Sequence, residues 1–139
     1  NETRKSPHLF AVDCGIFLID LWNFQLEEFK CPCGDCETKM DEEFLKKLQC
    51  ARTVAAIPFR ISSGYRCSSY NQEIGGVQDS SHTKGMGCDI KAASGKDKLT
   101  MLRSFLAVGF TRVGMYDSHV HVDIDANKPQ DVLWIGESK

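Results

Sequence analysis

The strongest constraint on the fold comes from residues 118–125, in which polar and apolar side chains alternate. Successive side chains on a β-strand point to opposite faces, so His119, His121 and Asp123 would share one face and the apolar residues between them the other. Same-face residues lie about 6.7 Å apart, which lets two imidazoles converge on one small volume. The stretch therefore predicts a strand that packs its apolar face on the core and directs its histidines and aspartate to a candidate functional site on the other face. An edge strand with a solvated polar face is the alternative.

Two amphipathic helices are predicted by apolar residues spaced three and four positions apart. The first is expected to begin after an N-cap at Asp41 and to run to about Ala55, before Pro58. Its apolar face would hold Phe44, Leu45, Leu48 and Ala51 or Ala55. The second is expected over Lys96–Leu106 and would end at Gly109. Its apolar face would hold Leu99, Leu102, Phe105 and Leu106.

Short strands are expected where brief apolar or alternating runs are bounded by turn-forming residues. The expected strands are Phe59–Ile61, Gly87–Ile90, Thr111–Tyr116 and Ser118–Asp125. A helical turn is expected over Asn23–Phe29, with Phe24, Leu26 and Phe29 in the core. The order helix, strand, strand, helix, strand, strand implies an α+β fold with a mainly antiparallel sheet packed with helices. At 139 residues the chain has the length of one domain, which we place at residues 1–139.

Composition excludes two classes of partner. The net charge of -2 gives no basis for attraction to nucleic acid or to an anionic membrane surface. The longest apolar run, residues 15–19, is too short to span a bilayer. We therefore expect neither a nucleic-acid nor a membrane partner.

The chain has seven cysteines, and three of them lie close together in the run Cys31-Pro32-Cys33-Gly34-Asp35-Cys36. Only Cys33 and Cys36 have the C-x-x-C spacing that thiolate zinc sites use, and no second such pair exists. A structural zinc site there would need a distant cysteine to complete it. Disulfide bonding and reduced thiols stay equally open, because the sequence does not reveal the compartment.

A metal-ligand pattern lies upstream of the alternating strand. His82 precedes Asp89 by seven residues, and Gly85 and Gly87 between them allow close backbone approach. Three of the four histidines of the chain lie in this stretch and in the strand at residues 118–125. A catalytic zinc ion usually takes three protein ligands of these types and leaves a fourth position for water.

Three motifs together resemble the zinc D-Ala-D-Ala carboxypeptidase family. They are Ser-Gly-Tyr-Arg at residues 63–66, Ser80-x-His82-x-x-Gly85-x-Gly87-x-Asp89, and His119-x-His121-x-Asp123. That family includes vancomycin-resistance D,D-dipeptidases and phage L-alanyl-D-glutamate endopeptidases, and it shares its fold with the hedgehog signalling domain. The resemblance spans residues 23 to about 125, and the lead-in at residues 23–34 is similar to a phage-associated branch. It implies a hedgehog-like, monomeric peptidase domain.

The resemblance also implies roles for individual residues. His82, Asp89 and His121 match the zinc ligands, and the fourth position would hold a water molecule whose pKa zinc lowers toward ~7. Arg66 matches the arginine that stabilises the oxyanion, with a surface ion pair as the alternative. Ser80 matches a substrate-binding position, with a turn hydroxyl as the alternative.

The general base is the point where the sequence departs from the family. Members commonly use a glutamate shortly before the last ligand, but no glutamate lies between Glu73 and Glu137. In the His-x-His branch a histidine stands two positions before that ligand, which makes His119 the predicted base and Asp117 the fallback. Asp123 would then orient His121.

We therefore expect a hydrolase, a zinc-dependent metallopeptidase that cuts peptidoglycan stem peptides of the bacterial cell wall. D-Ala-D-Ala carboxypeptidase and endolysin-type endopeptidase activities both stay open, as do a cell-envelope protein and a phage-released lysin. A catalytically inactive, zinc-containing binding module is the main alternative, and a cysteine-rich metal-storage or redox protein is a distant third. Trp134 is expected in the core rather than as a lid, and His8 at the surface.

Overall fold

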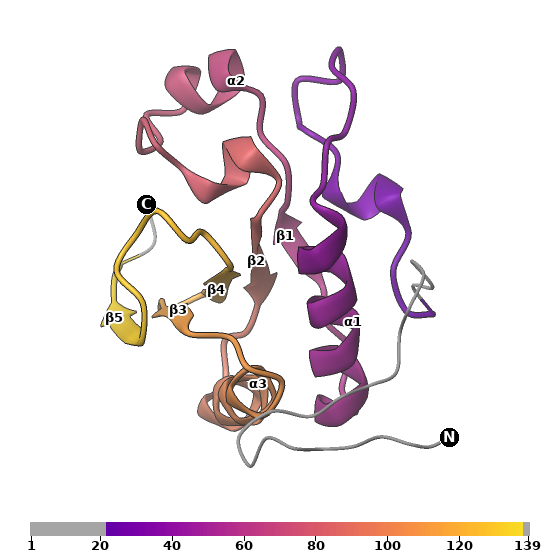
Figure 1. Ribbon diagram of the computed structural model, residues 1–139, viewed down its shortest axis with the longest axis vertical. Helices are drawn as coiled ribbons and strands as arrows, with labels where there is room; N and C mark the ends of the chain where they lie inside the picture. Colours follow the sequence, from indigo (N-terminus) through magenta and orange to yellow (C-terminus); the bar gives the residue numbers. More distant parts are fainter. Residues whose placement is uncertain (1–21, 138–139) are drawn as a thin grey trace.

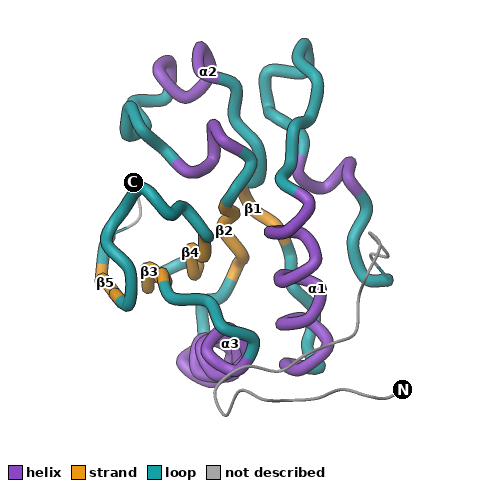
Figure 2. Tube along the Cα trace, viewed as in Figure 1, coloured by secondary structure: helices purple, strands orange, loops and turns teal. Residues whose placement is uncertain are grey.

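The computed structural model of the chain describes residues 22–137, and the predictions for His8 and for residues 15–19 lie outside that range. A five-stranded sheet runs through the middle of the described region, with its strands in the order β1-β2-β4-β3-β5 (Figures 1 and 2). The strands are β1 (Ile61–Ser63), β2 (Gly87–Lys91), β3 (Arg112–Met115), β4 (His119–Asp123) and β5 (Val132–Ile135). The helices are α1 (Glu42–Ala55), α2 (Ser68–Glu73) and α3 (Gly95–Ala107), with 3-10 helices η1 (Leu26–Phe29) and η2 (Ser81–Lys84).

The predicted α+β class is confirmed, but the sheet is mixed rather than mainly antiparallel. β2 pairs antiparallel with β1 and with β4, and β3 pairs antiparallel with β4. The correction comes from β5, which pairs parallel to β3 on the edge of the sheet. This strand was not expected from the sequence, because its four residues are all apolar and only the pairing with β3 gives them alternate exposure.

Helix α1 begins and ends where its sequence predicts. The carboxylate of Asp41 accepts a hydrogen bond from the backbone N–H of Phe44 at 2.9 Å, which satisfies one of the amides that every helix start leaves unpaired. Helix α3 is capped in the same way by Ser94, whose hydroxyl accepts from the N–H of Asp97. At its other end Gly109 adopts a φ of 93°, a left-handed conformation that glycine adopts without strain.

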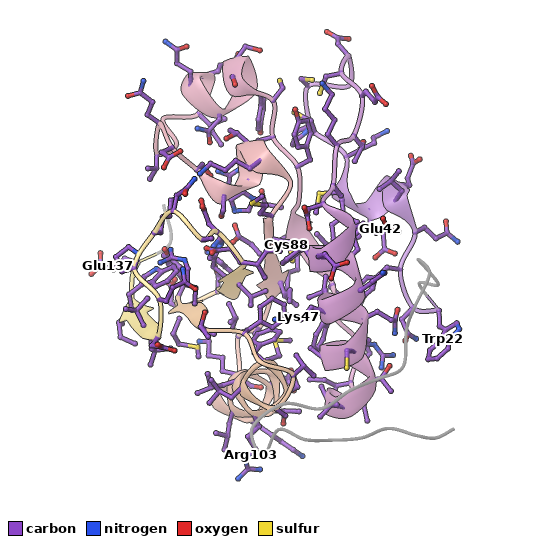
Figure 3. All side chains as sticks on the ribbon, in the orientation of Figure 1. Trp22, Glu42, Lys47, Cys88, Arg103 and Glu137 are labelled. Carbon is purple, nitrogen blue, oxygen red and sulfur yellow. The ribbon has the colours of Figure 1, made fainter. Side chains whose placement is uncertain are left out.

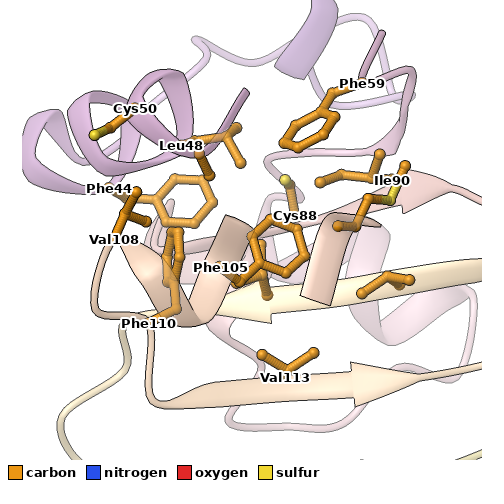
Figure 4. Close-up of a cluster of buried hydrophobic side chains, with 14 of the residues drawn as sticks. Phe44, Leu48, Cys50, Phe59, Cys88, Ile90, Phe105, Val108, Phe110 and Val113 are labelled. Carbon is orange, nitrogen blue, oxygen red and sulfur yellow. The ribbon is translucent and has the colours of Figure 1, made fainter. Parts of the chain in front are cut away.

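The core lies between one face of the sheet and the helices α1 and α3 (Figures 1 and 4). Phe105 packs edge-on against Phe110 with ring centroids 5.5 Å apart, and Phe44 packs against the same ring at 6.0 Å. The strands contribute fully buried side chains from alternate positions: Cys88 and Ile90 of β2 and Val120 and Val122 of β4. Cys88 lies on β2 in Figure 3, and it belongs to this core.

Several predicted details of the core are wrong. Leu99 and Leu106 of α3 are 49% and 54% exposed, because the buried stripe of this helix runs instead through Met101 and Phe105. Leu26 of η1 is likewise 48% exposed, although Phe24 and Phe29 beside it are buried as expected.

The first strand begins two residues later than predicted. Phe59 lies in the core but precedes β1, and Ser62 and Ser63, which follow the predicted strand, belong to β1. The pairings Ile61 with Ile90 and Ser63 with Asp89 fix this register. The pairing with β2 therefore sets the position of β1.

No helix within residues 22–137 is both long enough and apolar enough to cross a membrane.

Candidate metal centre

The face of the sheet away from α1 and α3 carries the predicted ligands. Asp89 of β2 and His121 of β4 are direct cross-strand partners, and His82 reaches them from η2. One ligand atom of each of these three residues lies within 4.8 Å of the others. The Asp89 Oδ1 atom is 3.4 Å from His82 Nε2 and 2.9 Å from His121 Nδ1. The two distant sequence motifs therefore meet at one point, as the family resemblance implies.

Local hydrogen bonds fix which nitrogen of His82 faces the centre. Its Nδ1 lies 2.7 Å from the carbonyl oxygen of Gly64. A carbonyl oxygen only accepts, so Nδ1 carries the hydrogen and the lone pair of Nε2 is left for the centre. The backbone N–H of His82 in turn donates to the hydroxyl of Ser80, the N-cap of η2, at 3.1 Å.

His121 is oriented by a second carboxylate. Its Nε2 lies 2.7 Å from Asp123 Oδ2, and its Nδ1 faces Asp89. Asp123 is 1% exposed and also accepts a 2.7 Å hydrogen bond from Nε of Arg112. This arrangement matches the carboxylate that commonly holds the outer nitrogen of a metal-ligating histidine. The Asp123 position that the alternation placed on this face therefore supports the ring of His121.

Electrostatics favour the charged forms of Asp89 and His121. Burial acts to raise the pKa of Asp89, but hydrogen bonds with His121 and His82 outweigh it and hold the pKa well below its usual range. Burial likewise acts to lower the pKa of His121, and its hydrogen bonds with Asp123 and Asp89 outweigh it and raise the pKa. An ionised carboxylate beside two imidazoles, each with a nitrogen directed at it, is a donor set that zinc accepts. The residues present therefore fit the ion.

His119 lies at the edge of this centre. Its Nε2 is 3.9 Å from Asp89 Oδ2, and its ring stacks on Tyr116 with centroids 4.4 Å apart. Burial lowers the pKa of His119, which favours the neutral imidazole near neutral pH. The hydroxyl of Ser118 lies 3.0 Å from its Nδ1.

Arg66 approaches the centre from the segment between β1 and α2. Its Nη2 lies 3.6 Å from Asp89 Oδ2, and its side chain is 16% exposed. Nε donates to Ser63 Oγ and Nη1 to Asn71 Oδ1, each at 3.1 Å. The guanidinium is thus held at the wall of the site, and it is not an exposed surface pair.

One cavity of about 590 Å³ contains all six predicted site residues in its lining. They are Arg66, Ser80, His82, Asp89, His119 and His121. Asp117, the fallback base, is not among the described residues that line it. The volume falls in the range of ligand-binding clefts.

Part of the cavity wall was not expected from the sequence. Trp134 is half-buried there and not in the core: its ring lies 5.6 Å from that of His121, and its indole N–H donates to the Tyr116 hydroxyl at 3.0 Å. Gly114 of β3 makes room for that indole, because a Cβ at this position would meet it at 2.5 Å. Glu137, labelled at the left of Figure 3, also lines the cavity. Only the register between β3 and β5 places Trp134 here, and a sequence pattern does not reveal it.

Comparison with known proteins agrees with this geometry. A family model described as Peptidase M15 matches residues 22–125, which is about three quarters of the chain. The match covers nearly the same residues as the resemblance that the motifs indicate, and it confirms that resemblance. A search of curated proteins finds no match.

Proposed function

Because the chain belongs to the Peptidase M15 family, we propose that it is a zinc-dependent peptidase that hydrolyses peptidoglycan stem peptides in the cavity described above. The family consists of zinc-dependent peptidases that act on peptidoglycan peptides. The observation that carries the proposal is the convergence of His82, Asp89 and His121 within 4.8 Å beside the half-buried Arg66.

We assign the zinc ligands to atoms that local contacts leave directed at the centre. They are Nε2 of His82, a carboxylate oxygen of Asp89 and Nδ1 of His121. When bound, zinc activates a water molecule and polarises the carbonyl group of the scissile bond. Asp123 and Arg112 support His121 from behind, so its ring needs no reorganisation when substrate binds.

Arg66 is assigned to the oxygen that becomes negative as the peptide bond is attacked. A guanidinium stays protonated at all relevant pH values and presents several donors in one plane. Its hydrogen bonds to Ser63 and Asn71 fix the side chain before substrate arrives. Such preorganised donors stabilise the transition state most strongly in a site that excludes water.

His119 is assigned as the general base. Its neutral imidazole can take a proton from the attacking water and pass it to the leaving amine. Stacking on Tyr116 and the contact with Ser118 hold the ring at the edge of the centre. Ser80 is assigned to substrate contact from the cavity wall, while its oxygen also caps η2.

The assay incubates the zinc-loaded protein with two substrates, a stem pentapeptide that ends in D-Ala-D-Ala and a muropeptide with an intact L-Ala-D-Glu bond. Mass spectrometry of the products identifies the bond that is cut and so distinguishes carboxypeptidase from endopeptidase. Absence of any product from the zinc-loaded protein would contradict the proposal.

A catalytically inactive zinc-containing binding module is the second candidate, and the absence of a glutamate between Glu73 and Glu137 favours it. The His119→Ala variant separates the two. If His119 is the base, His119→Ala lowers the hydrolysis rate by a factor on the order of 10²–10⁴. Asp117→Asn then leaves this rate unchanged. A binding module has no hydrolysis for either variant to alter.

A further inference from the structure

A second cluster of metal-binding side chains lies apart from the site already described. The loop after η1 carries Cys31, Cys33 and Cys36, and it runs beside the segment that enters α2 at Cys67 (Figure 1). The four sulfur atoms all lie within 4.8 Å of one another. None of these four thiols forms a disulfide.

The spacing of the sulfur atoms fits one tetrahedral ion. With Zn–S bonds of about 2.3 Å, two sulfur ligands of a tetrahedral zinc ion lie about 3.8 Å apart. The Cys31–Cys67 separation is 3.8 Å, the Cys33–Cys67 separation 3.9 Å and the Cys33–Cys36 separation 3.4 Å. A disulfide would instead need sulfur atoms about 2.05 Å apart in separate pairs. Here the sulfur of Cys33 is close to those of both Cys36 and Cys67, so the sulfur atoms surround one point and do not form separate pairs.

The backbone around the cluster is shaped for thiolates. Gly34 adopts a φ of 78° and donates its N–H to the carbonyl of Cys31, which turns the chain tightly inside the C-x-x-C element. The N–H of Asp35 donates to the sulfur of Cys33, and the N–H of Cys67 donates to the sulfur of Cys31, each at 3.4 Å. Hydrogen bonds from amides stabilise negative sulfur.

We propose that Cys31, Cys33, Cys36 and Cys67 bind a structural zinc ion, separate from the ion held by His82, Asp89 and His121. Four protein thiolates close the coordination shell, which is the arrangement of structural rather than catalytic zinc. Thiolates are soft ligands, so the site selects zinc over magnesium or calcium. Cys67 supplies the distant ligand that the C-x-x-C element needs.

The site joins the loop after η1 to the segment that carries Arg66. Cys67 directly follows Arg66 in the chain, and the N–H of Tyr65 donates to the carbonyl of Phe29 at 2.7 Å. A zinc ion would join these same segments through zinc–thiolate bonds and so fix the turn that carries Arg66. This anchoring role rests on the proposed function of Arg66, whereas the presence of the metal does not.

The test measures metal content of the full chain, purified without chelator under reducing conditions. We expect two zinc ions per chain in the wild type, one in His82→Ala and one in a Cys33→Ser/Cys36→Ser double variant. Cys88→Ala is the matched control, because this thiol lies in the core outside the cluster, and it keeps both ions. One zinc ion in the wild type, lost entirely in His82→Ala, would overturn the proposal.

Cobalt substitution identifies the ligands. Sulfur-to-cobalt charge-transfer absorption is expected in the wild type and in His82→Ala, and it disappears in the double cysteine variant. Because that variant could fail to fold, X-ray absorption at the zinc edge of the wild type provides an independent readout, with sulfur at about 2.3 Å. The proposed four-cysteine site would be contradicted by a spectrum with nitrogen and oxygen ligands alone. It would also be contradicted by peptide mapping that finds disulfides among the four cysteines.

Discussion

The two faces of the sheet are built from the same strands but follow different rules. On β2 and β4 the residues Ile90, Val120 and Val122 point into the core and are fully buried. Asp89 and His121, next to them in the chain, point into the cavity and form a network of charged and polar contacts. The core face is stabilised by close packing of apolar side chains, and the cavity face is organised by directed hydrogen bonds. Substitutions on the core face should therefore change the free energy of unfolding, and substitutions on the cavity face should change metal binding and activity.

The largest expected effect is on the cavity face. His82→Ala removes one of the three proposed ligands, so we expect the zinc of this centre to be lost and peptidase activity to fall to background. The free energy of unfolding of the metal-free protein should fall by only about 1–3 kcal/mol, because the variant loses the buried hydrogen bond to Gly64 and no core side chain. Activity assays and metal analysis check this result. A variant that keeps this zinc ion would break the comparison.

The corresponding change on the core face is Phe105→Ala. Phe105 is fully buried between Phe59 and Phe110, so its truncation should lower the free energy of unfolding by about 3–5 kcal/mol. The activity per folded molecule should be retained. Leu106→Ala on the same helix is the matched control, because Leu106 is 54% exposed. Chemical denaturation measures both, and an equal loss in the two variants would contradict the assignment of the core.

Arg66→Ala sharpens the comparison within the cavity. We expect the zinc to remain bound and kcat to fall by about 10²–10³, the usual loss for a donor that stabilises an oxyanion. Steady-state kinetics with zinc analysis checks both halves of this expectation. Arg60→Ala is the control, since Arg60 is an exposed arginine on the same segment of the chain. An effect confined to KM would mean that Arg66 only binds substrate.

The smallest expected effect comes from Asp123→Asn. The amide can no longer accept as a charged partner of His121, so zinc affinity should fall by about 10–100-fold. Titration with a competing chelator measures this change. Unchanged affinity would mean that the 2.7 Å contact between Asp123 and His121 does not support the metal centre.

The sequence predicted those parts of the molecule that depend on local pattern. The cap at Asp41, the helix that follows it and the alternation of β4 were all readable, because each depends on neighbours within a few residues. The convergence of His82 and His121 was expected from the family resemblance that their motifs carry, and local pattern alone does not give it. Parts set by long-range pairing were not readable, namely β5, the exposure of Leu99 and the place of Trp134 in the cavity wall. The same limit applies to Cys67, because nothing local links it to the Cys33-x-x-Cys36 element.

The central claim is that two segments far apart in sequence bind one catalytic ion with three protein ligands. The most direct test is a crystal structure of the zinc-loaded protein with anomalous data at the zinc edge. We predict an anomalous peak in contact with His82, Asp89 and His121, with the fourth position open to solvent. No peak at this centre, or a fourth protein donor that closes its coordination, would contradict the account.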